Sequence, residues 1–310
     1  MTLWKRFLAW GSYPLIVFGS LAVLLVGIEH AWLPASQLTF LLVLAMGLGI
    51  IVLEALIPDR PQQASWRVIW VDLLHNVFSS GGTSAVVRAT AFAGLVGLGG
   101  YLSVAVGRGL WPTNWPLLAQ IALSLVVGEF GVYWAHRLMH AYSALWRIHA
   151  LHHSPPHLYL LASARSHPFN AILVHSLQVG PVVFLGAGPE VIAATALVTA
   201  STGLLQHANV VMHTEWLNWL FATPDLHRTH HSVELEESNT NYGNNLILWD
   251  LVFGTRLTGH RPAEYGVTGV AWPETYLGQL ATPFTYDRLC AEAEAQSAVP
   301  EPGPRSLAPV

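Results

Sequence analysis

"SLVVGEFGVYWAHRLMH", residues 124–140, carries an uncharged apolar segment into two histidines, with Glu129 at the boundary. The uncharged part, at 109–128, has about the 20 residues that a helix needs to cross a bilayer core of about 30 Å. His136 and His140 are four residues apart, and side chains with this spacing project from one face of a helix. The stretch therefore predicts a membrane-spanning segment that leads into a histidine-bearing helix.

The composition indicates the same class of protein. Of the 310 residues, 53% are hydrophobic and only 10% are charged, which is too apolar for an ordinary soluble domain. We predict an all-α integral membrane protein with about four transmembrane helices, an apolar hairpin at 168–206 and a histidine-rich helical cap on the cytoplasmic side. The uncharged segments of suitable length are 8–28, 31–53, 89–107, 109–128 and 168–189. The segment at 8–28 is longer than the apolar region of a signal peptide, which has about 7–15 residues, so we expect that it is not cleaved off.

Basic residues indicate which ends of these segments face the cytoplasm, because short cytoplasmic loops carry an excess of Lys and Arg. Lys5 and Arg6 precede the first segment, further arginines lie in the loop at 58–88 and after the fourth segment, and Arg108 is the exception. The amino terminus, this loop and the histidine motifs are therefore expected on the cytoplasmic side. One lysine against thirteen arginines suggests a bacterial source, in which case the membrane is the plasma (inner) membrane.

Several classes of function are excluded by what the sequence lacks. Cys290 is the only cysteine, so an intrachain disulfide, a Cys-ligated zinc site and a Cys-held iron–sulfur cluster are impossible. A net charge of −4 and the lack of a basic run with interleaved aromatics argue against nucleic acid as a partner. No His-Glu-x-x-His helix, Gly-x-Ser-x-Gly elbow or strand-linked glycine fingerprint is present.

The histidines are concentrated in one part of the chain, because thirteen of the sixteen lie between His136 and His231. Three motifs, HRLMH (136–140), HALHH (149–153) and HRTHH (227–231), repeat the i, i+4 or i, i+3, i+4 spacing that places imidazoles on one helix face. His207 lies at the end of the apolar hairpin. Neutral imidazole is the commonest side-chain metal ligand, and nine histidines exceed the four that one tetrahedral ion accepts. Two metal ions are the simplest interpretation.

The ligand type alone leaves iron, copper and zinc open. A pair of redox-active irons suits oxygen activation at a lipid-facing site. Two other classes remain as alternatives, namely a metal-handling membrane protein and a histidine-dependent zinc hydrolase. Transporters usually place their ligands within the spans near the midplane, whereas these histidines cluster beyond the predicted span ends.

HRLMH, HALHHS and HRTHHS, followed by "NYGNNLILWDLVFGT", together resemble the fatty acid hydroxylase superfamily, the sterol desaturase-like integral-membrane oxygenases. The resemblance covers about residues 128–256. It implies a non-haem di-iron enzyme that uses O2 as co-substrate and two electrons to oxidise a lipid. It also implies nine metal ligands: His136, His140, His149, His152, His153, His207, His227, His230 and His231. His167 and His213 are further candidates, although on a continuous helix His213 would face about 240° away from His207.

Two carboxylates are candidates for supporting the histidines, because metal-bound imidazoles usually donate their second nitrogen to a carboxylate, a carbonyl or water. Glu129 lies two helical turns before His136, and Asp250 follows the third motif. We predict a membrane region at 1–127, a catalytic domain at 128–256, and a tail at 257–310 that is disordered from about 291.

The resulting functional prediction is hydroxylation of a fatty acid, sterol or alkyl lipid, with desaturation on the same site as the alternative. The chain has no nicotinamide or flavin motif, so electrons must come from a separate protein of the cytochrome b5, ferredoxin or reductase type. The cytoplasmic face is where such a donor would dock.

Overall fold

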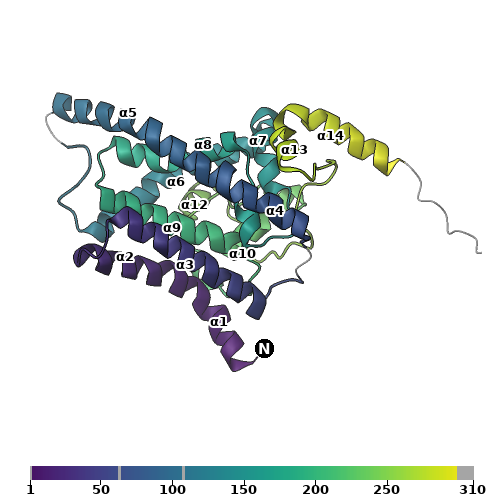
Figure 1. The fold of residues 1–310 in the computed structure, drawn as a ribbon, viewed down its shortest axis with the longest axis horizontal. Helices are drawn as coiled ribbons and strands as arrows, with labels where there is room; N and C mark the ends of the chain where they lie inside the picture. The colour runs from purple at the N-terminus through teal and green to yellow at the C-terminus, as the bar shows by residue number, and fades with distance from the viewer. Residues whose placement is uncertain (1, 62–63, 107–108, 299–310) are drawn as a thin grey trace, which may run out of the picture.

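The structure is a computed structural model that describes residues 2–61, 64–106 and 109–298, and it is mostly helical (Figure 1). Within these ranges there is no β-strand, only three isolated bridges. Three helices are long and apolar enough to cross a membrane, and two shorter apolar helices accompany them. The chain is therefore a helical membrane protein, as its composition indicates.

The first two candidate spans lie at the amino-terminal end. α1 (Leu3–Pro14), a π-helical turn and α2 (Ser20–Glu29) form one continuous span, and α3 (Ala35–Leu56) returns beside it. Only 17% of the most apolar window of α3 is buried inside the protein. A helix that is apolar all round and keeps its large side chains exposed is suited to contact with lipid. Such exposed side chains on α3 include Phe40, Leu44 and Leu48.

The third candidate span is α6 (Leu117–Ala141), which begins and ends later than the predicted segment at 109–128. Its start is displaced because the preceding turn contains prolines, and Pro116 occupies the N-cap position. The helix then continues without a break through Glu129 to the first histidine motif. One continuous helix therefore carries both the apolar span and two histidines.

α6 packs closely against α8 (Pro168–Phe184) because a glycine lies at their contact. A Cβ atom on Gly128 would lie 2.3 Å from the carbonyl oxygen of Gln178, a distance that no side chain tolerates. α8 and α9 (Pro189–His207) form the predicted apolar hairpin, and α9 packs against both α3 and α6. The hairpin thus lies between the first spans and α6, and it delivers His207 at its end.

The predicted loop at 58–88 is largely helical, so that part of the prediction was wrong. α4 (Trp66–Leu74), a π-helical turn at His75–Gly82 and α5 (Thr83–Val106) run as one long helix across the molecule (Figure 1). Asp72, a charged residue of this segment, is buried on α4 in an ion pair with Arg165 and does not interrupt the helix. The predicted span at 89–107 falls on α5, but the side chains of 88–93 and residues 107–108 lie outside the described residues.

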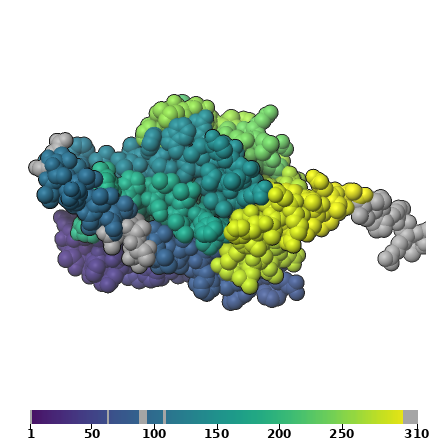
Figure 2. All heavy atoms as spheres, turned by 90° about the horizontal axis from the view of Figure 1, so that it is seen from above, coloured from purple at the N-terminus to yellow at the C-terminus, as the bar shows by residue number. Residues whose placement is uncertain are grey.

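The remaining helices are short and surround the histidine motifs, except for one at the carboxy terminus. They are α7 (Ser143–His153), α10 (Pro224–His230), α11 (Leu235–Ser238), α12 (Leu248–Phe253), α13 (Tyr276–Leu280) and α14 (Thr282–Ser297), with 3-10 turns at Leu160–Ala164 and Glu215–Leu217. Figure 2 shows the carboxy-terminal helices in yellow, projecting beyond one end of the helical body.

The predicted disorder from about residue 291 was wrong as far as Ser297, because α14 extends to that residue. Alanine and glutamate are strong helix formers, and the segment is rich in both. Arg288 and Glu292, one helical turn apart, also form an ion pair of 3.5 Å. Residues 299–310 lie outside the described residues.

Candidate metal centre

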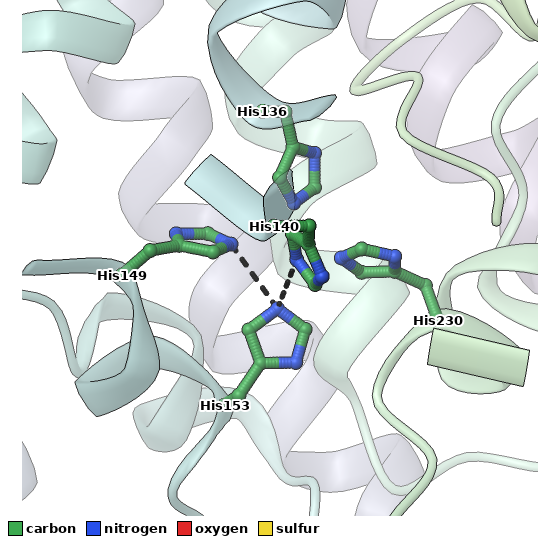
Figure 3. A group of neighbouring side chains, drawn as sticks. All are labelled: His136, His140, His149, His153 and His230. Carbon is green, nitrogen blue, oxygen red and sulfur yellow. Dashed lines mark hydrogen bonds between the residues drawn. The ribbon is translucent and has the colours of Figure 1, made fainter. Parts of the chain in front are cut away.

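The nine predicted ligands come together in two groups, which the ends of four helices deliver. Within each group, every histidine offers a ring nitrogen within 4.8 Å of the others. Group one consists of His136 and His140 from α6, His149 and His153 from α7, and His230 from α10 (Figure 3). Group two consists of His152 from α7, His207 from α9, and His227 and His231 from α10 and its C-cap.

Sequence neighbours belong to different groups, although the spacing was expected to place the imidazoles of each motif on one helix face. His152 and His153 separate, and so do His230 and His231. The pairs that share a group are those at i, i+4. The rings of His153 and His231 stack with centroids 4.4 Å apart, so the two groups adjoin each other. The arrangement is one centre with two adjacent positions for metal ions.

In group one, the backbone determines which ring nitrogens carry hydrogen. His136 Nδ1 lies 2.9 Å from the carbonyl oxygen of Tyr242, and His230 Nδ1 lies 2.7 Å from that of Thr240. Because a carbonyl can only accept, both Nδ1 atoms donate and both Nε2 atoms keep a lone pair. These Nε2 atoms are buried and have no hydrogen-bond partner in the described part of the chain. Leaving a buried acceptor unmet costs about 1–3 kcal/mol, which a bound cation would offset.

Group two follows the same rule. His207 Nδ1 donates to the carbonyl of Gly203 at 2.9 Å, and His152 Nδ1 donates to that of Arg165 at 3.3 Å. The Nε2 atoms of these two rings therefore both present lone pairs, yet they lie only 3.3 Å apart. His207 Nε2 is also 3.1 Å from His227 Nε2 and 3.2 Å from His231 Nε2. Converging lone pairs repel one another unless a cation lies between them.

The nitrogen spacing fits a metal ion. Two imidazole nitrogens that bind one ion at about 2.0–2.1 Å, with bond angles between about 90° and 109°, lie about 2.9–3.4 Å apart. In group one His153 Nε2 lies 3.2 Å from His140 Nε2 and 3.1 Å from His149 Nε2, the two contacts drawn in Figure 3. These contacts and those of His207 in group two fall within this range, and the other ligand nitrogens of each group lie within 4.8 Å of one another. The residues present therefore fit a metal at each position.

Burial keeps the imidazoles of the cap neutral. Desolvation lowers the pKa of His152 to about 4. It also lowers the pKa values of His149, His153, His227 and His231 well below the usual 6.5, and the neighbouring histidines lower them further. At pH 7 these rings are uncharged, which is the form that binds metal.

Glu129 and Asp250 contact a loop rather than the histidine rings, which corrects the expectation that they pair with the rings directly. Glu129 is fully buried and accepts hydrogen bonds from the backbone N–H of Asn244 and, at 2.9 Å, of Asn245. Asp250 accepts from the N–H groups of Tyr242 and Gly243, both at 2.8 Å. We call residues 242–245 the carbonyl loop, because the Tyr242 carbonyl in it receives the His136 Nδ1–H. Both carboxylates are therefore linked to the histidines through this loop.

His167 and His213 lie apart from both groups. His167 caps α8, where its Nδ1 accepts from the N–H of Phe169, and its Nε2 contacts the Leu280 carbonyl at 3.1 Å. His213 lies at the surface, 3.9 Å from a carboxylate oxygen of Glu215. The structure brings together the nine histidines that the resemblance implied and leaves these two further candidates elsewhere.

Some supporting contacts join residues that no local sequence pattern pairs with each other. Asn170 Oδ1 lies 3.0 Å from His149 Nδ1, and Asn239 Oδ1 lies 3.2 Å from His140 Nδ1. The buried guanidinium of Arg165 forms two bonds of 2.6 and 2.9 Å to the carboxylate of Asp72. This pair fixes the backbone at Arg165, whose carbonyl orients His152. Covariation between these distant positions in related sequences is the signal that would identify such contacts.

Comparisons with known proteins agree with the geometry. The profile of the family described as Fatty acid hydroxylase matches residues 121–255. The chain is 39% identical to the ornithine lipid hydroxylase OlsE of Rhizobium tropici over 232 residues, which are 73% of this chain and 70% of the relative. It is 30% identical to the alkylglycerol monooxygenase of Xenopus tropicalis over 45% of this chain and 31% of the relative. No solved structure matches.

A third relative, methylsterol monooxygenase 2-2 of Arabidopsis thaliana, is 27% identical over 44% of this chain and 52% of its own length. Hydroxylases and monooxygenases are oxidoreductases that act on C–H bonds with O2, and all three relatives carry such names. The match to OlsE extends well beyond the histidine motifs and covers more than two thirds of both chains. The chain therefore belongs to the fatty acid hydroxylase family.

Proposed function

We propose that this membrane oxidoreductase hydroxylates a membrane lipid, using O2 and two iron ions held by the two histidine groups. The observation that carries the proposal is the convergence of nine imidazoles, seven buried and two half-buried, on two adjoining positions, with lone pairs of at least four rings directed inward. The family membership supports lipid hydroxylation rather than metal handling or hydrolysis. A zinc site for hydrolysis would require only one group.

Each ion has its own set of ligands in this proposal. His136, His140, His149, His153 and His230 hold one iron, and His152, His207, His227 and His231 hold the other. His167 and His213 are not ligands. When bound, the two irons would activate O2, so that, with two electrons from an external donor, one oxygen atom enters a C–H bond and the other leaves as water. Overall, R–H, O2, two electrons and two protons give R–OH and water.

The residues of the chain itself have three tasks in this reaction. The neutral imidazoles provide ligand nitrogens without adding positive charge to the site. Nδ1–H donation to the carbonyls of Tyr242, Thr240, Gly203 and Arg165 holds the rings in orientation. Glu129 and Asp250 hold the carbonyl loop in place, so they are positioning residues. The catalytic part is 128–256, with the membrane region at 1–127 before it and 257–310 after it.

The proposed topology places this centre on the cytoplasmic side. The spans are Leu3–Glu29, Ala35–Leu56, the apolar part of α5, and Leu117–Ala141, and α8 and α9 enter the membrane as a hairpin. In Figure 1, α4, α7 and α10 lie toward one end of the helical body and the end of α5 lies at the other. Basic residues gather near the first end, which favours a cytoplasmic cap. In a bacterium this membrane is the plasma membrane.

A separate electron-transfer protein delivers the electrons, because the chain has no nicotinamide or flavin motif. The lipid to test first is one with an ornithine headgroup, given the extent of the match to OlsE.

Isotope labelling tests the proposal. The purified chain, loaded with iron and supplied with a chemical reductant and an ornithine-containing lipid, is incubated under O2 labelled with oxygen-18. Mass spectrometry should find a lipid product that carries one labelled oxygen atom, and none should form without O2. A product that has lost two hydrogens and gained no oxygen would indicate a desaturase. Turnover without O2 would indicate a hydrolase.

A further inference from the structure

A pocket of about 550 Å³ has Asp225 and Arg228 of α10 in its wall. The other walls come mainly from the segment that follows α9 and from residues 256–265. α10 and its C-cap also carry His227 and His231 of the second histidine group, so the pocket and that group share this helix.

Asn218 links two opposite charges inside this pocket. Its backbone carbonyl accepts from Arg256 Nε at 2.8 Å, and its side-chain Nδ2 donates to Asp225 Oδ2 at 2.9 Å. Asn218 itself is buried, and a hydrogen bond from Thr223 to its side-chain oxygen fixes it. The guanidinium and the carboxylate are thus held at a defined separation in one cavity.

Neither charge has an ionic partner in the described part of the chain. No carboxylate oxygen there lies within 4 Å of Arg256, and no cationic nitrogen lies within 4 Å of Asp225. The other arginines of the pocket are already paired, because Arg228 and Arg261 both contact Asp59. The guanidinium carbon of Arg256 lies over the ring of Trp219, 4.0 Å from the ring centroid. Its Nη groups are free to bind an anion.

The pocket opens beside exposed tryptophans. Trp219, in its wall, is 68% exposed, and Trp216 is 57% exposed on the same turn. Trp10, on the first span, lies 5.1 Å from the ring of His213, another wall residue. Tryptophan is enriched where a membrane protein meets the lipid headgroups. The exposed tryptophans therefore favour a position of the pocket at the level of the lipid headgroups.

We propose that this pocket, which we call the headgroup pocket, binds a lipid headgroup that carries both a carboxylate and an ammonium group. Arg256 binds the carboxylate, and Asp225 binds the ammonium. An N-acylated ornithine has this pair of charges, because its carboxylate and its side-chain amine both stay free. The inference rests on the proposed function, since it names the class of lipid that the enzyme oxidises.

Binding of three matched compounds to the purified full chain tests the headgroup pocket, by calorimetry and without reductant. N-acetylornithine carries both charges, N-acetylnorvaline lacks the ammonium, and N-acetylputrescine lacks the carboxylate. N-acetylornithine should bind more tightly than either of the others by about 10-fold or more, because each charged hydrogen bond contributes about 1.5–3 kcal/mol.

Variants assign each charge to its residue. Arg256→Gln should weaken N-acetylornithine about 10-fold or more and leave N-acetylputrescine unchanged, whereas Asp225→Asn should weaken both and leave N-acetylnorvaline unchanged. Arg288→Gln is the matched control, because Arg288 is 68% exposed at its side chain, pairs with Glu292 and does not line the pocket. It should alter binding less than about twofold.

Equal binding of the three compounds, or no change in Arg256→Gln, would overturn the headgroup pocket. The oxygen-labelling experiment separates this failure from that of the proposed function. Labelled product without selective binding refutes the pocket alone. Selective binding without labelled product retains the pocket as a site for a zwitterionic headgroup and refutes hydroxylation.

Discussion

Replacing His152 or His230 by alanine should abolish lipid hydroxylation and leave about one iron per chain instead of two. His152 belongs to the four-histidine group and His230 to the five-histidine group, so each variant removes a ligand from a different ion. Mutation of a residue that hydrogen-bonds to a metal ligand typically reduces metal affinity or activity about 10–100-fold. Removal of a ligand itself should have a larger effect. Iron per chain, measured by mass spectrometry of the metal, and labelled lipid product are the two readouts.

His213→Ala is the matched control for both substitutions. His213 lies outside the two groups, and its side chain is 38% exposed. The control should retain two irons per chain. Wild-type activity in His152→Ala or His230→Ala would contradict the ligand assignment. Loss of both irons from either variant would contradict the division into two groups, because it would mean that the ions bind only together.

Glu129→Gln should reduce the rate of hydroxylation about 10–100-fold and reduce the iron content much less. Glu129 accepts hydrogen bonds from two backbone N–H groups and from Asn245 Nδ2. Both of its carboxylate oxygens therefore act as acceptors for the carbonyl loop. The glutamine amide replaces one acceptor oxygen by an NH2 group, which faces a donor. An unmet buried donor costs about 1–3 kcal/mol, and the loop can avoid that cost only by moving. Movement of the Tyr242 carbonyl releases His136 from its orientation.

The control for the change of carboxylate to amide is Glu292→Gln, on the exposed surface of α14. It should leave both rate and iron content unchanged. Asp250→Asn should act like Glu129→Gln, because Asp250 holds the other half of the carbonyl loop. Wild-type kinetics in Glu129→Gln would show that Glu129 does not position His136 through the carbonyl loop.

The histidine motifs predicted the identity of the clustered residues but not their division between the two groups. Spacing at i, i+4 placed His149 beside His153 and His227 beside His231, because both pairs lie on one helix. Helical periodicity could not place His152 opposite His153. That separation depends on His207, at the end of α9, lying beside His152 while His140, on α6, lies beside His153, which is a matter of tertiary packing.

The supporting carboxylates illustrate the same limit. Its position at the end of an apolar segment of the sequence identified Glu129 as unusual, because an unpaired ionisable group there is costly. Its partners, however, lie 115 and 116 residues further along the chain, and no local pattern indicates them. The asparagines after the third motif are therefore more than turn formers. Their backbone N–H groups are the donors that Glu129 requires.

Errors in the predicted elements also have physical causes. Prolines before α6 delay its start to Leu117, so the span is displaced toward the histidines. Charges in 58–88 suggested a loop, whereas α4 buries Asp72 against Arg165 and stays helical. Composition suggested disorder after 291, whereas the helix propensity of alanine and glutamate continues α14. In each case local propensity or tertiary pairing outweighed the compositional signal.

The central claim is that two irons occupy the two histidine groups, and the iron content of the purified wild-type chain tests it most directly. The measurement is made on protein expressed with ample iron and purified without chelators, with zinc and copper determined in the same sample. The structure predicts two irons per chain. One iron or fewer per chain, or zinc or copper in their place, would contradict the claim.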